Sequence, residues 1–573
     1  MTMNKIFKTH LHNKLSLWLI GILLTWFITA FLIVPNINIL STTFFVDGAF
    51  SLEPFEKLLS SERAMKSLLN SFVLAVSLVI TVNIVGVFLV LVTDYFDIKG
   101  AKLLKLGYFT TLIYGGLILV AGYQFIYGSN GLLTSFLAPI FPGMNEDWFI
   151  GYPAVLFVMT FACTTNHILF LSNAVKSIDF QTVEAAKNMG ASPWTILRQV
   201  VFPVLRPVLT TLSVLLFATG LGALSAPLIV GGESFQTISP MILSFANSIG
   251  SRDLAALLAI FLGVSQITLL YFITRAEKKG FYMSVSKVKT KIVKQKINNK
   301  FVNVFVHVLA YLLFAIYVLP IAAVIIFSFT DTYSISTGTL SWEHFTLDHY
   351  RKILFDASAY EPFIISIIYS GLTAVIVVLA MLFIARLIHK HNNRLTTTLE
   401  YLLHIPWLIP GILMALGLII TYDKPMPIMG NIVLTGTLVL LLIAYIIDKI
   451  PFTLRIMKAA YYSFDSSLED AAKNLGARPL YTFIRVILPI VLPTSLAILA
   501  LNFNSLLADY DLTVFLYHPF FQPLGIVIRN NTDPTAGVDA RAMNFVYSVI
   551  LMVISAAVIY FVYGRGSSKK NIL

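Results

Sequence analysis

The feature that most limits what this 573-residue chain can fold into is a series of long apolar runs. A helix of about 20 such residues crosses the hydrocarbon core of a bilayer, which is roughly 30 Å thick. Twelve runs reach this length, and eleven contain no Asp, Glu, Lys or Arg. They lie near Leu15–Leu40, Leu68–Val92, Leu106–Tyr127, Phe149–Val175, Pro207–Gly232, Leu254–Thr274, Phe301–Thr330, Pro362–Ala385, Tyr401–Tyr422, Pro427–Ile447, Ile490–Leu516 and Ala542–Tyr563. Their length without strand-like alternation predicts an all-α polytopic membrane protein rather than a β-barrel.

Composition excludes most other classes of protein. Hydrophobic residues make up 57% of the chain and charged residues 12%, whereas soluble chains carry roughly 25% charged residues. A soluble enzyme, a disordered scaffold and a secreted disulfide protein are therefore excluded. The single cysteine, Cys163, lies in an apolar run and is expected to be a small buried residue. Basic residues before the first run resemble a signal peptide, but the run is too long, so we expect a retained helix.

The positions of the charges predict the orientation. With a cytoplasmic N-terminus, 31 of the 40 Lys and Arg residues fall in cytoplasmic segments and 9 in outer loops. This positive-inside bias also places the C-terminus in the cytoplasm. The net charge of +12 thus marks topology and predicts no nucleic-acid partner. The lipid bilayer itself is the surrounding partner.

A basic stretch divides the chain. Residues 275–300 contain nine basic residues and one acidic residue, Glu277. We expect a solvated cytoplasmic linker, with a lipid-headgroup or regulatory role as the alternative. It separates a first six-helix half, residues 1–274, from a second, residues 301–573.

The two halves share a repeated loop. Residues 184–207 and 470–493 are identical at 10 of 24 positions, with an offset of 286. The acidic residue and the alanines that follow it favour a helix start. A glycine and then a proline three residues later predict a left-handed helix end followed by a second helix, which leads back to the membrane at Pro203 or Pro489. A short helix duplicated on the cytoplasmic side is suited to docking, although an ordinary connection has the same local pattern.

These loops resemble the EAA loop of binding-protein-dependent, type I ABC importer permeases. The matching residues of the first copy are Glu184, Ala185, Ala186, Gly190, Val200, Phe202 and Pro203. Those of the second are Asp470, Ala471, Ala472, Gly476, Val486, Leu488 and Pro489, with Asp470 in the Glu position and Glu469 beside it. In that family the loop is a coupling helix that sits in a groove of the ATPase subunit.

The resemblance implies the fold and the partners. It implies about 12 transmembrane helices arranged as two pseudo-symmetric six-helix importer halves. The fused form resembles the ferric-iron permease family, with thiamine and phosphonate permeases as relatives. It also implies two ATPase subunits, an extracytoplasmic solute-binding protein and a location in the bacterial cytoplasmic membrane.

Several catalytic motifs are missing from the sequence. It contains no Gly-x-x-x-x-Gly-Lys-Ser/Thr phosphate loop, no paired Cys/His spacing and no Gly-x-Ser-x-Gly elbow. We therefore expect a non-catalytic permease that binds no cofactor, with ATP used by a separate subunit. Whether the chain holds a metal is left open.

Polar residues in the eleventh run are candidates for the translocation path. Asn502, Asn504, Asp509 and Asp511 lie there, and an acid within a span normally faces protein or water. Hydration near the outer boundary, or capping of a broken helix, is the alternative for the two acids. In ferric-type permeases an acid tends to occupy the place of Asp509.

The fifth run has no acid at the corresponding place. Pro227 and nearby glycines instead predict a break in the helix, which is tolerated where backbone lines protein or a cavity. The fifth and eleventh runs are thus the candidate path-lining helices. For His404, His307, Asn166 and His167, hydrogen bonds between helices are favoured over contact with substrate.

These observations predict an ATP-driven importer permease, with ferric iron as the leading substrate. Thiamine, 2-aminoethylphosphonate and polyamines remain alternatives within the same importer class. An ion-coupled secondary transporter also has two six-helix halves, and a channel or membrane scaffold is a third possibility. The repeated loop argues against both.

Overall fold

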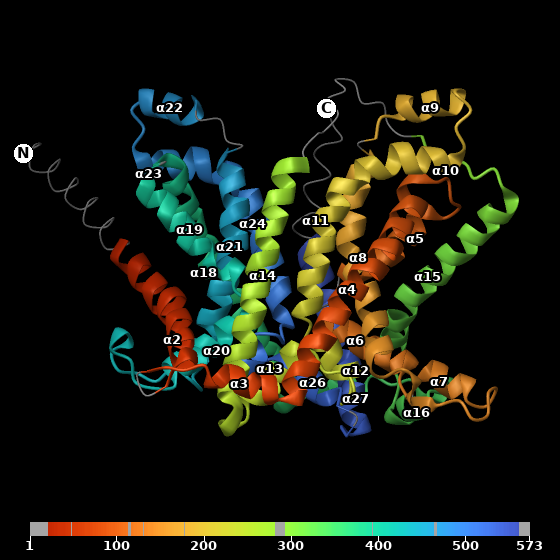
Figure 1. Ribbon diagram of the computed structural model, residues 1–573, viewed down its shortest axis with the longest axis horizontal. Helices are drawn as coiled ribbons and strands as arrows, with labels where there is room; N and C mark the ends of the chain where they lie inside the picture. The colour runs from red at the N-terminus through yellow and green to blue at the C-terminus, as the bar shows by residue number, and fades with distance from the viewer. Residues whose placement is uncertain are drawn as a thin grey trace, which may run out of the picture.

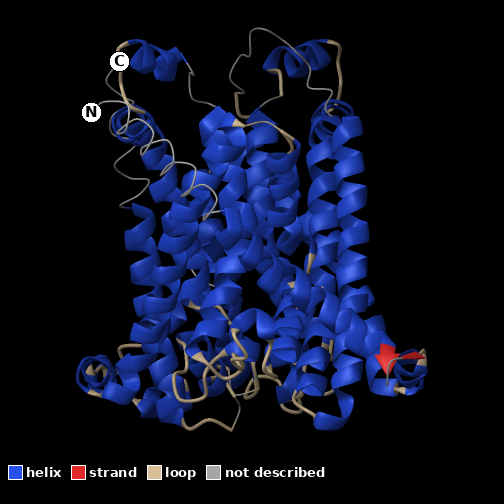
Figure 2. Ribbon diagram, turned by 90° about the vertical axis from the view of Figure 1, so that its left-hand side faces the viewer, coloured by secondary structure: helices blue, strands red, loops and turns tan. Residues whose placement is uncertain are grey.

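The computed structural model describes residues 21–560, apart from gaps at 47–48, 113–115, 130, 177, 281–292, 392, 463–466 and 534. Regular β-structure within these residues consists of one two-stranded antiparallel hairpin, β1 (Phe45–Val46) with β2 (Ala49–Phe50), at one edge of the molecule (Figure 2). The remaining elements are helices, so the prediction of an all-α fold is confirmed.

Eleven of the twelve predicted spans are present as membrane-length elements among the described residues. Nine are helices long and apolar enough to cross a membrane. Two more are pairs of helices bent by about 100° at a short break: Ala101–Thr111 with Gly116–Leu137, and Arg394–Leu408 with Gly411–Tyr422. The first described span, Gly21–Phe44, contains η1 (Thr29–Ile33) and α2 (Val34–Phe44).

The elements of the first half follow α2 in chain order. They are α3 (Glu53–Ser60), α4 (Glu62–Val90), η2 (Leu91–Tyr95), α5 (Ala101–Tyr108), η3 (Phe109–Leu112), α6 (Gly116–Tyr127), α7 (Leu132–Leu137), η4 (Glu146–Trp148), α8 (Tyr152–Lys176), α9 (Phe180–Asn188), α10 (Pro193–Ile196), η5 (Leu197–Val201), α11 (Phe202–Leu221), α12 (Ser225–Val230), α13 (Ile238–Ala246), η6 (Ile249–Ser251) and α14 (Arg252–Gly280).

The second half begins with α15. Its elements are α15 (Lys300–Phe327), α16 (Thr332–Thr337), η7 (Trp342–His344), α17 (Asp348–Phe355), α18 (Ala357–Lys390), α19 (Arg394–Leu408), α20 (Gly411–Tyr422), η8 (Pro427–Met429), α21 (Leu438–Tyr462), α22 (Ser467–Asn474), α23 (Pro479–Thr482), η9 (Phe483–Ile487), α24 (Leu488–Leu507), α25 (Thr513–Leu516), α26 (Leu524–Asn531) and α27 (Val538–Ile559).

The helices of the two halves correspond one to one over most of their length. The helices α17, α18 and α20 begin 295 residues after their counterparts α3, α4 and α6. The helices α21 to α27 begin 286 to 288 residues after their counterparts α8 to α14. The offset changes because the connection from α6 to α8 is nine residues longer than that from α20 to α21. The internal duplication therefore extends far beyond the repeated loop.

The first spanning helix of each half packs against the opposite half. The α2 helix packs on α20, where Asn38 Nδ2 donates to Thr421 Oγ1 at 3.1 Å. The α15 helix packs on α5 and α6, and Tyr108 Oη donates to the Ala310 carbonyl at 2.8 Å. The largest buried apolar cluster accordingly contains residues of both halves. The halves are interlocked as well as joined by the linker.

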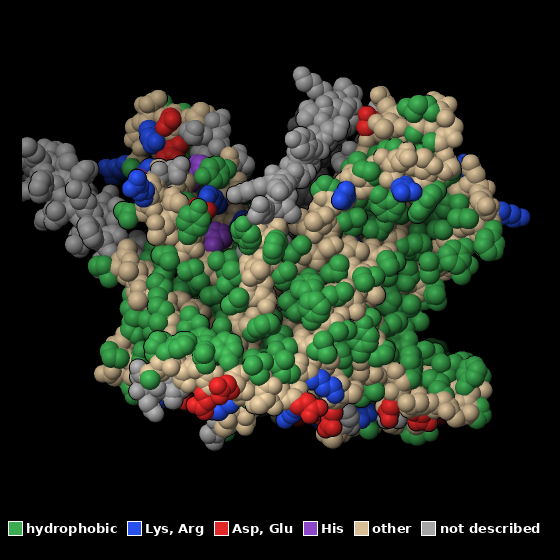
Figure 3. Space-filling view, viewed as in Figure 1, with side chains coloured by type: hydrophobic (Ala, Val, Ile, Leu, Met, Phe, Trp, Pro, Cys, Tyr) green, Lys and Arg blue, Asp and Glu red, His purple; other side chains and the backbone are tan. Residues whose placement is uncertain are grey.

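The two ends of the molecule differ in their elements. Both short helices of the repeated loops, α9 and α22, lie at one end, and α3, α7, α16 and α26 lie at the other (Figure 1). Hydrophobic side chains cover the middle of the visible face, whereas charged side chains gather toward the two ends (Figure 3). This is the surface expected of a protein that spans a bilayer.

Three of the predicted spans, the fifth, the tenth and the eleventh, start at the wrong residue. The tenth, Pro427–Ile447, is displaced: residues 423–437 form a loop containing η8, and α21 runs from Leu438 to Tyr462. Gly430 and Gly436 adopt positive φ in that loop, which ends regular helix. The fifth span begins at Pro193 rather than Pro207, and the eleventh at Pro479 rather than Ile490. In each case the short helix after the repeated loop continues through a π-helical turn, η5 or η9, into the long helix.

The predicted linker is partly helix and partly an attached strand-like segment. The α14 helix continues to Gly280, so it includes the first residues of the predicted 275–300 linker. Residues 281–292 lie outside the described part of the chain. The segment 293–299 returns to the first half, where Gln295 forms a parallel bridge with Phe96.

Candidate functional site

The first repeated loop forms a helix with a left-handed end. Asp179 caps α9 by accepting from the Gln181 amide at 3.0 Å. Gly190 has φ of +81°; its amide donates to the Lys187 carbonyl at 2.8 Å, and the Ala191 amide donates to the Ala186 carbonyl at 3.0 Å. This pair of bonds is a Schellman motif, which satisfies carbonyls that the helix end would leave free.

The second loop has the same hydrogen bonds at α22. Gly476 has φ of +80°, its amide donates to the Lys473 carbonyl at 2.9 Å, and the Ala477 amide donates to the Ala472 carbonyl at 3.0 Å. Glu184, Ala185 and Ala186 lie in α9, and Asp470, Ala471 and Ala472 lie in α22. The helix and glycine turn predicted for each copy are therefore present.

Each turn leads directly into a long membrane helix. Pro193 and Pro479 occupy the first turns of α10 and α23, where a missing amide hydrogen costs nothing. Each short helix continues through a π-helical turn into α11 or α24, so Pro203 and Pro489 lie inside continuous helices. Both helices have 29 residues and are roughly 43 Å long. Each loop is thus continuous with one long helix.

Both loops expose apolar side chains at matching positions. Met189 is 80% exposed and its counterpart Leu475 is 88% exposed. Trp194 and its counterpart Leu480 are exposed as well. Four large apolar side chains on two protruding loops suggest contact surfaces for another protein.

The second loop is attached to the membrane helices by an ion pair. Glu469 pairs with Arg386 of α18 at 3.3 Å, and the Arg386 guanidinium lies over the Phe483 ring at 5.4 Å. The residue of the motif itself, Asp470, accepts from Lys473 at 3.1 Å, and this hydrogen bond raises the pKa of Lys473. Glu469, rather than Asp470, therefore fixes α22 to its half.

The first loop is attached in a different way. Val183, the counterpart of Glu469, is buried, and Lys187 donates to Gln295 Oε1 of the segment that follows the linker. The Gln295 amide donates to the Tyr95 carbonyl at 2.9 Å, and the Asp97 amide donates to the Gln295 carbonyl at 2.9 Å. The end of the linker thus connects α9 to the end of α4.

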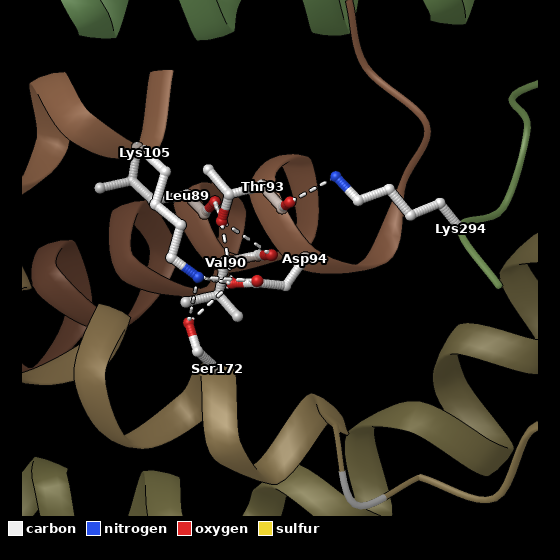
Figure 4. A network of polar contacts seen from close by, with 7 residues as sticks. All are labelled: Leu89, Val90, Thr93, Asp94, Lys105, Ser172 and Lys294. Carbon is white, nitrogen blue, oxygen red and sulfur yellow. Dashed lines mark hydrogen bonds and ion pairs between the residues drawn. The ribbon is translucent and has the colours of Figure 1, made fainter. Parts of the chain in front are cut away.

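The end of α4 is held by a polar network (Figure 4). Lys105 pairs with Asp94 at 2.6 Å, Ser172 Oγ donates to Asp94 Oδ2 at 2.7 Å, and Lys294 Nζ donates to the Thr93 carbonyl at 2.7 Å. These side chains come from η2, α5, α8 and the segment after the linker. The network joins the segment that holds the first repeated loop to η2, α5 and α8 of the first half.

This asymmetry gives a testable expectation. Replacing Gln295 with alanine removes the contact with Lys187, which is worth about 1 kcal/mol. We expect backbone amide exchange in residues 180–191 to rise about fivefold and exchange in residues 467–477 to stay unchanged. The matched control is Lys473→Ala, since Lys473 is the counterpart of Lys187 and bonds only within α22. Equal changes in amide exchange in both loops, in either variant, would show that the Lys187–Gln295 contact does not hold the first loop.

The helices α11 and α24 are each followed by a break, and the two breaks contact each other between the halves. The α11 helix ends at Leu221 and α24 at Leu507, which are 286 residues apart. Ser225 Oγ, at the start of α12, donates to Asp511 Oδ1 at 3.2 Å, and these two positions are also 286 residues apart. The break of the first half lies at Gly222–Leu224, not at Pro227, which is buried in the first turn of α12 where its missing amide hydrogen is harmless.

Asp509 caps the short helix after the second break. Its Oδ2 accepts from the amides of Leu512 at 3.3 Å and Thr513 at 3.2 Å, and from Thr513 Oγ1 at 2.9 Å. This is the capping alternative considered for the acid. Asp511, by contrast, is exposed and reaches the other half.

The two asparagines of the eleventh span face neighbouring helices. Asn502 is buried and donates to Thr453 Oγ1 of α21 at 2.8 Å. Asn504 donates to the Ser555 carbonyl of α27 at 3.3 Å, and its buried Oδ1 accepts no hydrogen bond from the described residues. The structure therefore brings Asp511, but not Asn502, to the boundary between the halves.

The sequence reasoning missed a charged pair inside a membrane helix. Asp448 and Lys449 of α21 lie 2.8 Å apart, and the charge of Lys449 acts on Asp509. They were missed because the tenth span was predicted to end at Ile447, where the charge-free run ends, so the two residues fell outside it. Opposite charges next to each other at the end of an apolar run are the signal that could have found them.

The prediction of hydrogen bonds between helices is confirmed for His167, whereas His307 bonds to the loop before α5, and His404 and Asn166 make no such bond within the described residues. His167 bonds to Asn83 of α4 at 3.1 Å, and His307 accepts from the Lys99 amide at 3.3 Å. His404 bonds to the Glu400 carbonyl of its own helix at 2.7 Å, and Asn166 is exposed. No group of three or more His, Cys, Asp and Glu side chains arranged to hold a metal occurs in the described part of the chain.

Comparison with known proteins identifies relatives over the whole chain. Residues 382–565 match the family model described as binding-protein-dependent transport system inner membrane component. A probable ABC transporter permease protein y4fN from Sinorhizobium fredii is 37% identical over 96% of both chains. The ferric transport system permease protein FbpB of Actinobacillus pleuropneumoniae is 24% identical over 93% of this chain and 75% of its own.

Other similarities cover about half of the chain. A putative 2-aminoethylphosphonate transport system permease protein PhnV from Salmonella paratyphi A is 24% identical over 43% of this chain and 90% of its own. Among solved structures, a bacterial ABC transporter involved in the import of alginate matches 48% of this chain and 99% of its own, at 18% identity and a TM-score of 0.39.

Proposed function

Because the chain belongs to the ABC transporter permease family, we propose that it is the permease subunit of a type I importer driven by ATP. Solute reaches its outer face from an extracytoplasmic binding protein. Two ATPase subunits bind α9 and α22 on the cytoplasmic side, where the N- and C-termini also lie. ATP is used by those subunits, and the permease binds no cofactor and catalyses no covalent reaction.

The observation that carries this proposal is the equivalence of the two loops. Each is a short helix that ends in a Schellman turn, each exposes apolar side chains, and each leads into a 29-residue helix. Two equivalent docking helices suit a pair of identical ATPase subunits. The motif residues of both loops, from Glu184 to Pro203 and from Asp470 to Pro489, then couple ATP use to transport.

The helices α11 and α24 supply a mechanism. When the ATPase subunits close on ATP, α9 and α22 move together and tilt the helices attached to them. The broken ends at Gly222–Leu224 and Ala508–Leu512 then change their separation, which opens the path on one side and closes it on the other. Asp509 and Asp511 lie in the second break, Pro227 follows the first break in α12, and Asn502 and Asn504 lie on α24.

For the substrate we propose ferric iron. Support comes from the fused two-half organisation, from the relative named as a ferric permease and from the acids Asp448, Asp509 and Asp511 near the breaks. Carboxylate oxygen suits a hard cation. Thiamine, 2-aminoethylphosphonate and polyamines are the alternatives, and one group of relatives is named for 2-aminoethylphosphonate.

Uptake by cells that lack the gene tests the substrate. We expect uptake of radiolabelled ferric iron to fall on deletion and to be restored by the wild-type chain, while uptake of 2-aminoethylphosphonate, thiamine and spermidine is unchanged. Loss of uptake of one of the organic solutes, with iron uptake intact, assigns that solute and rejects iron. Neither result alters the assignment of the coupling loops.

A further inference from the structure

Five exposed lysines form a basic corner at the end of the molecule that carries α9 and α22 (Figure 1). Lys99 lies in the loop before α5, and Lys102 lies in the first turn of that helix. Lys294 and Lys296 belong to the segment after the linker, and Lys300 is the first residue of α15. None of the five forms an ion pair with a described residue. Their charges are therefore available to a ligand.

Backbone contacts hold the two parts of the basic corner together. The segment after the linker forms a parallel bridge with Phe96. The Lys99 amide donates to His307 Nε2 at 3.3 Å, and Tyr311 Oη donates to the Lys99 carbonyl at 2.9 Å. Lys99 thus lies against α15, about two turns from Lys300. The fold keeps like charges from both halves close to one another, and such charges repel unless an anion lies between them.

The acidic residues nearby do not neutralise the basic corner. Asp97 is the acid within residues 95–104 and 293–303, and it is exposed and forms no ion pair with a described residue. Asp94, just before these residues, is already paired with Lys105 at 2.6 Å. Five lysines against one free carboxylate leave a clear excess of positive charge. The basic corner therefore favours an anionic ligand.

Exposed apolar side chains continue from the basic corner along two spanning segments. The α15 helix packs beside α5 at the edge of the molecule (Figure 1). On α5 the exposed apolar residues are Leu103 and Leu106, and on α15 they are Phe301, Val304, Phe305, Val308 and Leu312. Both helices belong to elements long and apolar enough to cross a membrane. Lysines at the end of such a surface lie at the depth of the lipid headgroups, where their ammonium groups remain hydrated.

We propose that Lys99, Lys102, Lys296 and Lys300 bind the headgroup of an anionic phospholipid. The ammonium groups donate to its phosphate oxygens, and its acyl chains lie along the exposed side chains of α5 and α15. A soluble anion matches the charges alone, whereas a lipid also covers the apolar surface that continues from them. The bound headgroup contacts the first half and the start of the second at the place where the chain returns from the linker.

Lipids that share their acyl chains but differ in charge test the proposal. The purified full-length chain is titrated with dioleoyl phosphatidylglycerol, with dioleoyl phosphatidylcholine and with glycerophosphoglycerol, which is the anionic headgroup without acyl chains. Bound ligand is counted by native mass spectrometry. We expect phosphatidylglycerol to be retained about tenfold more than phosphatidylcholine, and the free headgroup not to be retained. Equal retention of the two lipids, or retention of the free headgroup at the level of phosphatidylglycerol, would overturn the proposal.

A double variant and a matched control locate the site. Lys99→Gln with Lys102→Gln removes two charges and keeps the contacts with α15, since these involve the Lys99 backbone. The preference for phosphatidylglycerol is expected to fall to about threefold or less. Lys390→Gln with Arg394→Gln removes the same charge from the end of α18 and the start of α19, where both side chains are exposed, and is expected to leave the preference unchanged.

The two double variants separate a site from general attraction to negative lipid. An unchanged preference in the first double variant, or an equal loss in both, would show that the basic corner does not hold the lipid. Neither ATP nor transport enters this measurement, so its outcome is independent of the proposed function.

Discussion

Replacing Gly476 with valine is expected to reduce solute transport at least tenfold while the protein remains inserted in the membrane. Gly476 has φ of +80°, and a Cβ added there would meet no atom within 4 Å. The expected damage is therefore to the backbone turn and not to packing. An L-residue in this conformation costs about 1–2 kcal/mol, and a β-branched residue is the least tolerant. The turn that directs α22 into α23 and α24 would then be lost.

Two controls separate the turn from other effects of the substitution. Gly476→Asn is expected to retain most transport, because asparagine tolerates the left-handed conformation. Gly436→Val introduces the same strain at φ of +77°, again with open space around Cβ, but in the loop before α21 at the opposite end. Transport and membrane insertion are both measured for each variant. Normal transport by Gly476→Val, or equal loss in Gly436→Val, would remove the special role of the turn.

Introducing charge at Met189 and Leu475 is expected to abolish binding of the ATPase subunits. These side chains directly follow α9 and α22 and are 80% and 88% exposed, and burying one such side chain at an interface contributes about 1.5–3 kcal/mol. We therefore expect Met189→Glu with Leu475→Glu to weaken binding at least 100-fold. Binding is measured by titrating the purified ATPase subunit against the permease in nanodiscs.

The opposite end of the molecule offers the matched control. Trp342, in the segment after α16, is 90% exposed, so Trp342→Glu removes an equally exposed apolar side chain without touching either loop. ATPase binding by this variant is expected to equal that of the wild type. If the double variant bound the ATPase subunit as tightly as Trp342→Glu, the apolar side chains of the loops would not form the docking surface.

Features that depend on local sequence could be predicted. Long charge-free runs place the spanning helices, and the Gly-x-x-Pro pattern at Gly190 and Gly476 places the two turns, since both depend on residues close in the chain. The break after α11 was predicted as well, from Pro227 and the glycines near it. A proline near the start of a helix is tolerated, and Gly222 is the residue at which α11 ends.

Features that depend on distant residues could not be predicted. The Ser225–Asp511 contact joins positions 286 residues apart, and the attachment of Lys187 to Gln295 depends on the path of the chain after the linker. The Asp448–Lys449 pair was missed because neighbouring opposite charges allow a helix to continue past an apolar run.

The central claim is that movement of α9 and α22, driven by ATP, carries solute through the permease. The most direct measurement is solute uptake into proteoliposomes that contain the permease and its ATPase subunits, with binding protein and solute outside and ATP inside, in the absence of any ion gradient. The account predicts uptake that requires ATP and is lost in Gly476→Val but not in Gly476→Asn. Uptake driven by a proton or sodium gradient without ATP, and unaffected by Gly476→Val, would contradict it and identify an ion-coupled transporter.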